Sequence, residues 1–196
     1  MRVTRKKTSL LCRKCKGLET KAQFEKIYEG KKDASILIIK CFPAYEECAQ
    51  GKFFVSEAGR RFRFMFQQHV CPLEQCLIVP MIRCSSEPRL ANVRKCSGGV
   101  ELALKRERKV IICLGRLVLK HVFMRGATPP PLDILLGRIT RMPEQKAAII
   151  TLPEVEDLLL VEQNPTDFRY NPAKELQMRS KQMNQGLLAV VKALEE

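Results

Sequence analysis

Four short apolar segments, separated by stretches of mixed polarity, dominate the pattern of the 196-residue chain. They are rich in Ile, Leu and Val, are bounded by charged residues or proline, and span residues 34–40, 75–83, 109–114 and 146–151. Continuous apolar runs of this length are typical of strands that are buried on both faces. The pattern therefore predicts four strands of a mostly parallel sheet.

The segments between these strands have helical character. We expect helices over residues 57–69, 97–108 and 115–124, and a helix or loop around 21–29. Asn171 and Pro172 supply an N-cap and a first helical residue for a C-terminal helix over 171–196. Its apolar stripe favours docking on the protein's own core over a partner helix. Three consecutive prolines make 125–132 a loop.

Strands that alternate with helices predict an α/β fold with a central, mostly parallel four-stranded sheet flanked by helices. The length suits one domain over 1–196, with residues 1–33 as a basic arm. No apolar run reaches the roughly 18 residues that cross a bilayer, and the basic start lacks the apolar stretch of a secretory signal. We therefore expect an intracellular protein without a membrane partner, cytoplasmic or at a nuclear or viral replication site.

The charge balance favours a polyanionic partner. The chain has 35 Lys and Arg against 21 Asp and Glu, a formal net charge of +14. Nucleic acid is the commonest polyanion that such basic domains bind, although a basic protein with merely solvated side chains is the alternative. Besides the N-terminal arm, the side chains expected to contact DNA are Arg60, Arg61, Arg63, Arg83, Arg89, Arg94, Lys95, Lys105, Arg106 and Arg108.

Nine cysteines are a second unusual feature of the composition. Their odd number and the expected reducing compartment argue against a disulfide framework. Cys113 lies inside an apolar run and is expected to be buried. Cys12 and Cys15 are spaced to chelate one metal, and Cys84 with Cys96 is the second pair that we propose. Four thiolates suit either zinc or an iron–sulfur cluster, so spacing alone leaves both open.

Several segments follow one another in an order that is characteristic of a known family. They are the Cys12-x2-Cys15 pair, ILIIKCFPA (36–44), GKFFVSEAG (51–59), VPMIRC (79–84) with Cys96 behind it, VIICLGR (110–116) and TLPEV (151–155). Together they resemble the iron–sulfur uracil-DNA glycosylases, often called family 4, across residues 12 to about 165. That family carries CxxC, GEAPGxxE, GxPFVGxAG, TNxxKC, a further cysteine, VIxxLGR and HPSxLLR in the same order.

The resemblance implies the three-layer sandwich of that family, with helices on both sides of the sheet. It also implies that Cys12, Cys15, Cys84 and Cys96 bind a [4Fe–4S] cluster, for which zinc is the runner-up. In the family this cluster is structural, and it ties the N-terminal arm and a middle loop to the body of the protein.

The polar groups of the family's base pocket are largely missing here. Phe54 matches the aromatic residue that stacks on the base. The catalytic acid falls on Cys41, the Asn that reads the uracil edge on Pro80, and the His on Leu152. None of these three side chains can position water, read a base edge or stabilise the departing uracil anion in the family's way.

We therefore expect a degenerate, non-catalytic member of that superfamily, which binds DNA as an accessory subunit in replication or repair. A polymerase or another replication or repair protein is the expected partner, by analogy with large DNA viruses that tether their polymerase through a glycosylase homologue. One alternative is an active glycosylase for uracil or another damaged base, in which Glu46 or Glu47 replaces the lost acid beside Phe54. A zinc-bound nucleic-acid module unrelated to glycosylases is the other.

Overall fold

The computed structural model describes residues 28–84, 93, 96, 98–124, 127–135, 138–141, 146–156 and 172–196. Several predictions concern residues outside these ranges. They are residues 1–27 of the predicted basic arm, with Cys12 and Cys15, and the DNA contacts proposed for Arg89, Arg94 and Lys95; the end of the arm, residues 28–33, is described and includes a strand of the sheet.

The core of the fold is a five-stranded sheet with strand order β1-β3-β2-β4-β5. Four parallel strands form its body: β2 (Ile36–Lys40), β3 (Leu77–Pro80), β4 (Val110–Leu114) and β5 (Ala148–Leu152). They coincide with the four apolar runs, so the predicted α/β fold with a mostly parallel sheet is confirmed.

The fifth strand, β1 (Glu29–Gly30), was not predicted, and it replaces the end of the helix or loop expected around residues 21–29. It pairs antiparallel with β3 at the edge of the sheet. Two residues show no apolar alternation, so the sequence carries no strand signal there. Gly30 has a φ of +93°, and a Cβ at this position would overlap the carbonyl oxygen of Cys76. The close approach of β1 to Cys76, the residue before β3, therefore requires glycine at this position.

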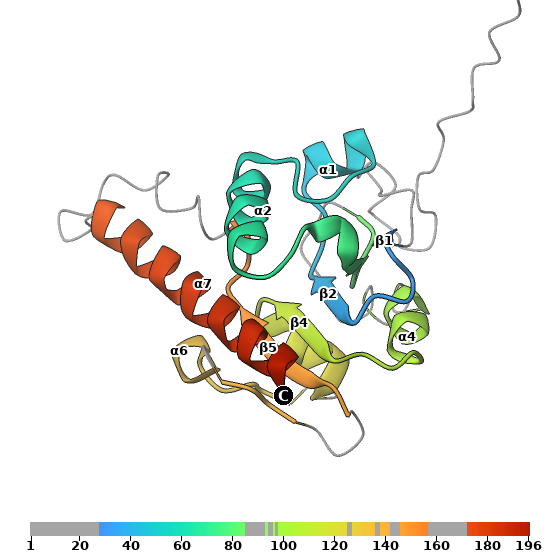
Figure 1. Cartoon of the computed structure of the whole chain (residues 1–196). Helices are drawn as coiled ribbons and strands as arrows, with labels where there is room; N and C mark the ends of the chain where they lie inside the picture. The colour runs from blue at the N-terminus through green and yellow to red at the C-terminus, as the bar shows by residue number, and fades with distance from the viewer. Residues whose placement is uncertain are drawn as a thin grey trace, which may run out of the picture.

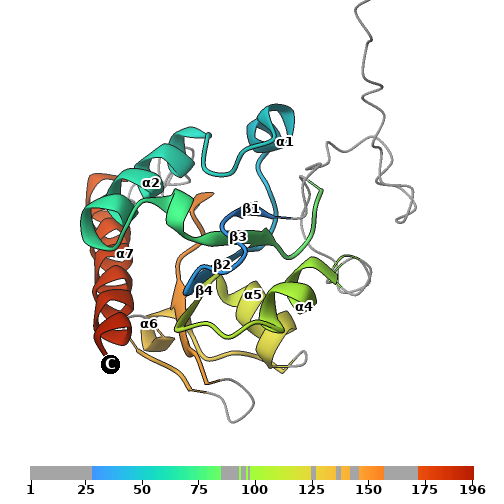
Figure 2. The same cartoon turned by 45° about the vertical axis from the view of Figure 1, so that its right-hand side comes forward.

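Helices cover both faces of the sheet and make three layers (Figures 1 and 2). One face carries α2 (Glu57–His69) and α7 (Pro172–Glu195). The other carries α4 (Gly98–Leu104), α5 (Arg116–Val118) and the π-helical turn η2 (Leu119–Phe123). All lie within the segments for which the sequence predicts helices.

Three short elements were not predicted, because too few residues take part to show an apolar period. They are α1 (Tyr45–Gln50), the 3₁₀ turn η1 (Leu73–Gln75) and α6 (Leu132–Leu135). Residues 127–131 form no helix or strand, in agreement with the predicted proline loop. No helix in the described ranges is both long and apolar enough to span a membrane.

The strands divide the apolar side chains between two cores, since alternate residues of a strand point to opposite faces. In β2, Ile36 and Ile38 belong to the core beneath α2 and α7, whereas Leu37 and Ile39 belong to the core beneath α4 and η2. The C-terminal helix contributes fully buried side chains to the first core, as its apolar stripe predicted; they are Met183, Leu187 and Val190.

Replacement of Leu187 by alanine tests this docking of α7. Leu187 is fully buried, so Leu187→Ala should lower the free energy of unfolding by about 2–5 kcal/mol through lost burial and a residual cavity. The neighbouring Leu188 is 59% exposed, and Leu188→Ala should cost less than about 0.5 kcal/mol. Urea denaturation measures both values. Equal losses would contradict the observed orientation of the helix.

Candidate functional site

The carboxyl ends of the parallel strands meet at one edge of the sheet, where α/β folds commonly place ligand sites. At this edge Lys40 pairs with Pro80 across β2 and β3, and Leu152 ends β5. Cys41 follows Lys40, and the Phe54 ring lies against the Lys40 side chain. We call this region the carboxyl edge. The four predicted pocket residues, Phe54, Cys41, Pro80 and Leu152, are all buried there.

The loop that carries Phe54 is held in a strained conformation. Phe54 has a φ of +56° and is the only non-glycine residue in the described ranges with a positive φ. A Cβ on Gly59 would lie 2.5 Å from the Phe54 Cα, so α2 can begin this close only with glycine. The Phe54 amide donates to Glu47 Oε1 at 2.6 Å, and its ring contacts Phe62 at 4.8 Å between centroids. These contacts fix the phenylalanine that the sequence predicted as a stacking platform.

A buried ion cluster occupies the centre of the carboxyl edge. The Lys40 ammonium donates to both carboxylate oxygens of Glu47, at 3.0 and 2.9 Å, and to Glu156 Oε1 at 2.6 Å. Lys40 and Glu47 are fully buried, and the Glu156 side chain is 31% exposed. Lys40 Nζ also lies 5.3 Å from the centroid of the Phe54 ring, within the range of a cation–π contact.

The cluster keeps Lys40 charged. Burial by itself lowers the pKa of Lys40, but the carboxylates of Glu156 and Glu47 outweigh burial and raise it above its ordinary value. Burial raises the pKa of Glu47, against the opposing effects of Lys40 and of the Ala44 amide, which donates to Glu47 Oε2 at 2.8 Å. A permanently protonated lysine has no lone pair and therefore cannot act as a nucleophile.

Cys41, which the sequence analysis aligned with a catalytic acid, is surrounded by groups that keep its thiol neutral. Burial, and then the adjacent Glu154, raises the pKa of the Cys41 thiol far above its ordinary value. The Glu154 side chain packs directly on Gly115, which has a φ of +87°. A Cβ added at Gly115 would overlap the Glu154 carboxylate. A neutral thiol beside a carboxylate offers no anionic oxygen of its own for activating water.

Leu152, which the sequence analysis aligned with a histidine, belongs to the core. The side chain is fully buried, and a Cβ on Gly186 of α7 would overlap its Cδ2 atom. The helix thus packs directly on Leu152, and the position has no polar group for a developing negative charge.

Glu46 and Glu47, the two residues considered as replacements for the missing catalytic acid, differ in their surroundings. Glu46 is exposed on α1. Glu47 is buried, and its carboxylate accepts hydrogen bonds from Lys40, Ala44 and Phe54. These bonds tie α1, β2 and the Phe54 loop together, which is a structural role.

Three residues of this site were missed by the sequence analysis, namely Lys40, Glu154 and Glu156. Lys40 ends an otherwise apolar strand, and this was one available signal of a buried polar group. Two acids at alternate positions directly after the last strand were another. Neither signal reveals the pairing, because Lys40 and Glu156 are separated by 116 positions in the chain.

Most of the predicted DNA-contacting arginines near α2 already have intramolecular acceptors. Arg60 donates to the Val55 carbonyl at 2.7 Å. Arg61 pairs with Glu57 at 3.1 Å, and Arg63 pairs with Glu74 at 2.5 Å; all three arginines lie on α2. Arg83 follows β3 and is half-buried.

Arg108 is removed from the predicted DNA-contacting surface by its burial. Only 7% of the residue is exposed, and its guanidinium donates to the carbonyl oxygens of Ala34, Lys32 and Ala103. Arg108 therefore ties the end of α4 to the chain that enters β2. Lys105 and Arg106, by contrast, are exposed.

Two of the four predicted cluster ligands lie within the described residues. Cys84 is buried just after β3, and Cys96 is half-buried just before α4. Within the described ranges no group of three or more potential metal ligands is found, and Cys12 and Cys15 lie outside them. The metal site stays a prediction. Cys113, predicted to be buried, is indeed fully buried.

Comparison with known families finds a match over most of the chain. The profile of the Uracil DNA glycosylase superfamily matches residues 27–188, which include all five strands and most of α7. A comparison with curated proteins finds no match.

Replacement of Lys40 tests the buried ion cluster. Lys40→Met should lower the free energy of unfolding by about 3–5 kcal/mol, because it leaves the Glu47 charge buried without its cation. Adding Glu47→Gln to Lys40→Met should recover part of this loss. Lys52→Met, at an exposed lysine near the same loop, is the control and should change stability by less than about 0.5 kcal/mol. A Lys40→Met protein as stable as the parent in urea would contradict the cluster.

Proposed function

This chain belongs to the uracil DNA glycosylase superfamily, and from that premise we propose that it is a non-catalytic, DNA-binding member. We propose further that it serves as an accessory subunit in DNA replication or repair, inside the cell, with a polymerase or another replication or repair protein as its partner. The net charge of +14 supports the DNA-binding part of the proposal.

The observation that carries the proposal is the ion cluster against Phe54. By resemblance, Phe54 is the platform on which an extruded base would stack. Here the Lys40 ammonium lies over that ring, and Phe62 contacts the ring as well. A base stacked on the face that Lys40 covers would separate the ammonium from Glu47 and Glu156. Separating a buried cation from its carboxylates is costly, so the cluster opposes entry of a base.

The positions that the resemblance assigns to base excision also lack the polar groups of that chemistry. Hydrolysis of the N-glycosidic bond needs a carboxylate or amide that positions water and a donor that stabilises the departing base anion. Cys41 holds a neutral thiol, and Pro80 and Leu152 have no polar side-chain atom. Loss of one preorganised polar group typically costs ~10²–10³ in rate, so loss of three leaves little activity.

We also propose that Cys12, Cys15, Cys84 and Cys96 hold a [4Fe–4S] cluster. The order of the four cysteines supports this, as do the places of Cys84 and Cys96, which lie close to the body at the end of β3 and the start of α4. Burial of Cys84 suits a thiolate ligand that is sheltered from solvent. Such a cluster would cross-link the N-terminal arm to this region and stabilise the folded state.

The proposed lack of catalysis predicts no base excision. The protein should release no uracil from single- or double-stranded oligonucleotides, and no hypoxanthine, above the rate without protein. An active uracil-DNA glycosylase on the same strands is the positive control. Alkaline cleavage at abasic sites measures the product. Excision that disappears in a folded Glu46→Gln or Glu47→Gln variant would instead establish an active glycosylase.

The proposed cluster predicts a brown protein after anaerobic purification, with absorbance at about 400 nm and one [4Fe–4S] cluster per chain. Alanine at Cys84 or Cys96 should remove the iron and reduce solubility, because the cross-link is lost. Cys113→Ala is the control and should leave the iron content unchanged, since Cys113 is fully buried within strand β4 and is not one of the four proposed ligands. A colourless protein with one zinc per chain would favour the runner-up metal.

A further inference from the structure

Exposed cations gather at the edge of the sheet opposite to the ion cluster. The segments that enter β2, β4 and β5 at residues 31–33, 105–109 and 146–147 form this amino edge. It presents six exposed cations against two exposed acids. The cations are Lys31, Lys32, Lys105, Arg106, Lys109 and Lys146, and the acids are Asp33 and Glu107.

The carboxyl edge has the opposite character. The buried Lys40 ammonium there faces the carboxylates of Glu47 and Glu156, with Glu154 beside Cys41. An incoming phosphate would meet carboxylates around a buried cation at this edge, whereas it would meet exposed cations at the amino edge. The electrostatic field therefore favours a polyanion at the amino edge.

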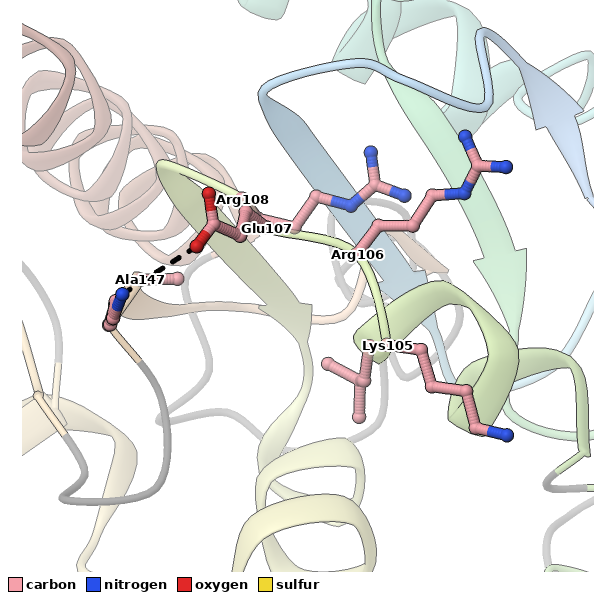
Figure 3. A pocket seen from close by; sticks show the side chains of 7 residues that line it. Lys105, Arg106, Glu107, Arg108 and Ala147 are labelled. Carbon is pink, nitrogen blue, oxygen red and sulfur yellow. Dashed lines mark ion pairs between the residues drawn. The ribbon is translucent and has the colours of Figure 1, made fainter.

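Two neighbouring hollows shape the amino edge. The larger has a volume of about 400 Å³ and is lined by Lys105, Arg106, Glu107 and Lys146 among others (Figure 3). In Figure 3 the Arg106 and Arg108 side chains extend from the same loop in the same general direction. The second hollow, of about 260 Å³, shares both arginines and continues to Tyr28 and Lys32.

Arg108 gives this surface a rigid base. Its guanidinium is held by three backbone carbonyl oxygens, including those of Lys32 and Ala103, so the loops that carry Lys32 and Arg106 are fixed relative to each other. Burial and the nearby positive charge of Arg106 lower the pKa of Arg108. Cations are thus held close together, and a bound anion would relieve their repulsion.

The second hollow adds apolar and aromatic surface to the charges. The Lys32 ammonium lies 5.3 Å from the centroid of the Tyr28 ring, and Leu102 beside it is 60% exposed. Cations interleaved with an aromatic ring and apolar surface are typical of grooves that bind a single nucleic-acid strand. An acidic protein surface would use the cations but has less need of this aromatic ring.

We propose that the amino edge binds a nucleic-acid strand, with its phosphates on Lys105 and Arg106 and with a base or sugar near Tyr28. Lys146 lies beside this path and is paired with Glu107 at 3.6 Å. This inference rests on the proposed DNA-binding function and names the surface that performs it. The strand then lies on the edge of the sheet opposite to Phe54. The ion cluster and the binding surface do not compete, since they occupy different ends of the strands.

Two charge-matched double variants test the location. Lys105→Gln with Arg106→Gln removes two positive charges from the amino edge, and Arg60→Gln with Arg61→Gln removes two from α2. All four side chains are exposed, so both proteins should fold like the parent. Fluorescence anisotropy with a labelled single-stranded oligonucleotide measures Kd at several salt concentrations. The amino-edge variant should bind at least about tenfold more weakly, with a salt slope smaller by about two, and the α2 variant within about threefold of the parent.

Each other outcome overturns a specific statement. If the parent protein does not bind DNA at low salt, the proposed function fails. If the parent binds and the α2 variant loses as much affinity as the amino-edge variant, the DNA-binding function stands and the assigned surface is wrong. Poly-glutamate that binds as tightly as DNA, with the same dependence on Lys105 and Arg106, would assign the surface to an acidic protein instead.

A footprint on the unaltered protein provides a second measurement. Acetylation of lysines, followed by mass spectrometry, should show protection of Lys105, Lys109 and Lys146 when the oligonucleotide is bound. Lys52, near the Phe54 loop, is the matched exposed lysine and should react equally with and without DNA. Protection of Lys52 alone would move the DNA to the carboxyl edge and overturn the proposal.

Discussion

The buried Lys40 ammonium, held between Glu47 and Glu156, is the interaction on which the candidate site depends. It joins the end of β2 to α1 and to the chain that leaves β5. Through Glu47 it also reaches the Phe54 amide, which keeps the aromatic ring in its strained loop. Removal of Lys40 leaves the Glu47 charge buried without its cation, so the lysine and the buried glutamate depend on each other.

The same constraint underlies the proposal that the protein does not carry out base excision. The parallel sheet and the helical layers are present, Phe54 is the platform that the resemblance proposes, and the strand ends carry Cys41, Pro80 and Leu152. With the platform covered by Lys40, the proposed function moves from excision of a base to binding of a strand. The exposed cations of the amino edge offer that strand a surface away from the carboxylates.

Much of this fold could be predicted from the chain because its strong signals are local. Continuous apolar runs identified the four parallel strands, and Asn171-Pro172 marked the start of α7. The strand β1 could not be predicted, because two residues carry no period. At the site, the order of the motifs predicted that Phe54, Cys41, Pro80 and Leu152 lie together at one edge of the sheet. The partners of Lys40 and the burial of Arg108 escaped prediction, because both depend on contacts between segments distant in the chain.

The central claim is that the Lys40 ion cluster prevents a base from stacking on Phe54. Heteronuclear NMR of the Lys40 side-chain ammonium, assigned by comparison with Lys40→Met, tests this claim most directly. Ammonium protons that are buried against two carboxylates exchange slowly with water, and the raised pKa of Lys40 keeps the group protonated at neutral pH. The account predicts a slowly exchanging Lys40 ammonium at neutral pH whose resonances do not move when uracil or a uracil-containing strand is added. A rapidly exchanging ammonium, or resonances that shift on addition of uracil, would show that the site is open and would contradict it.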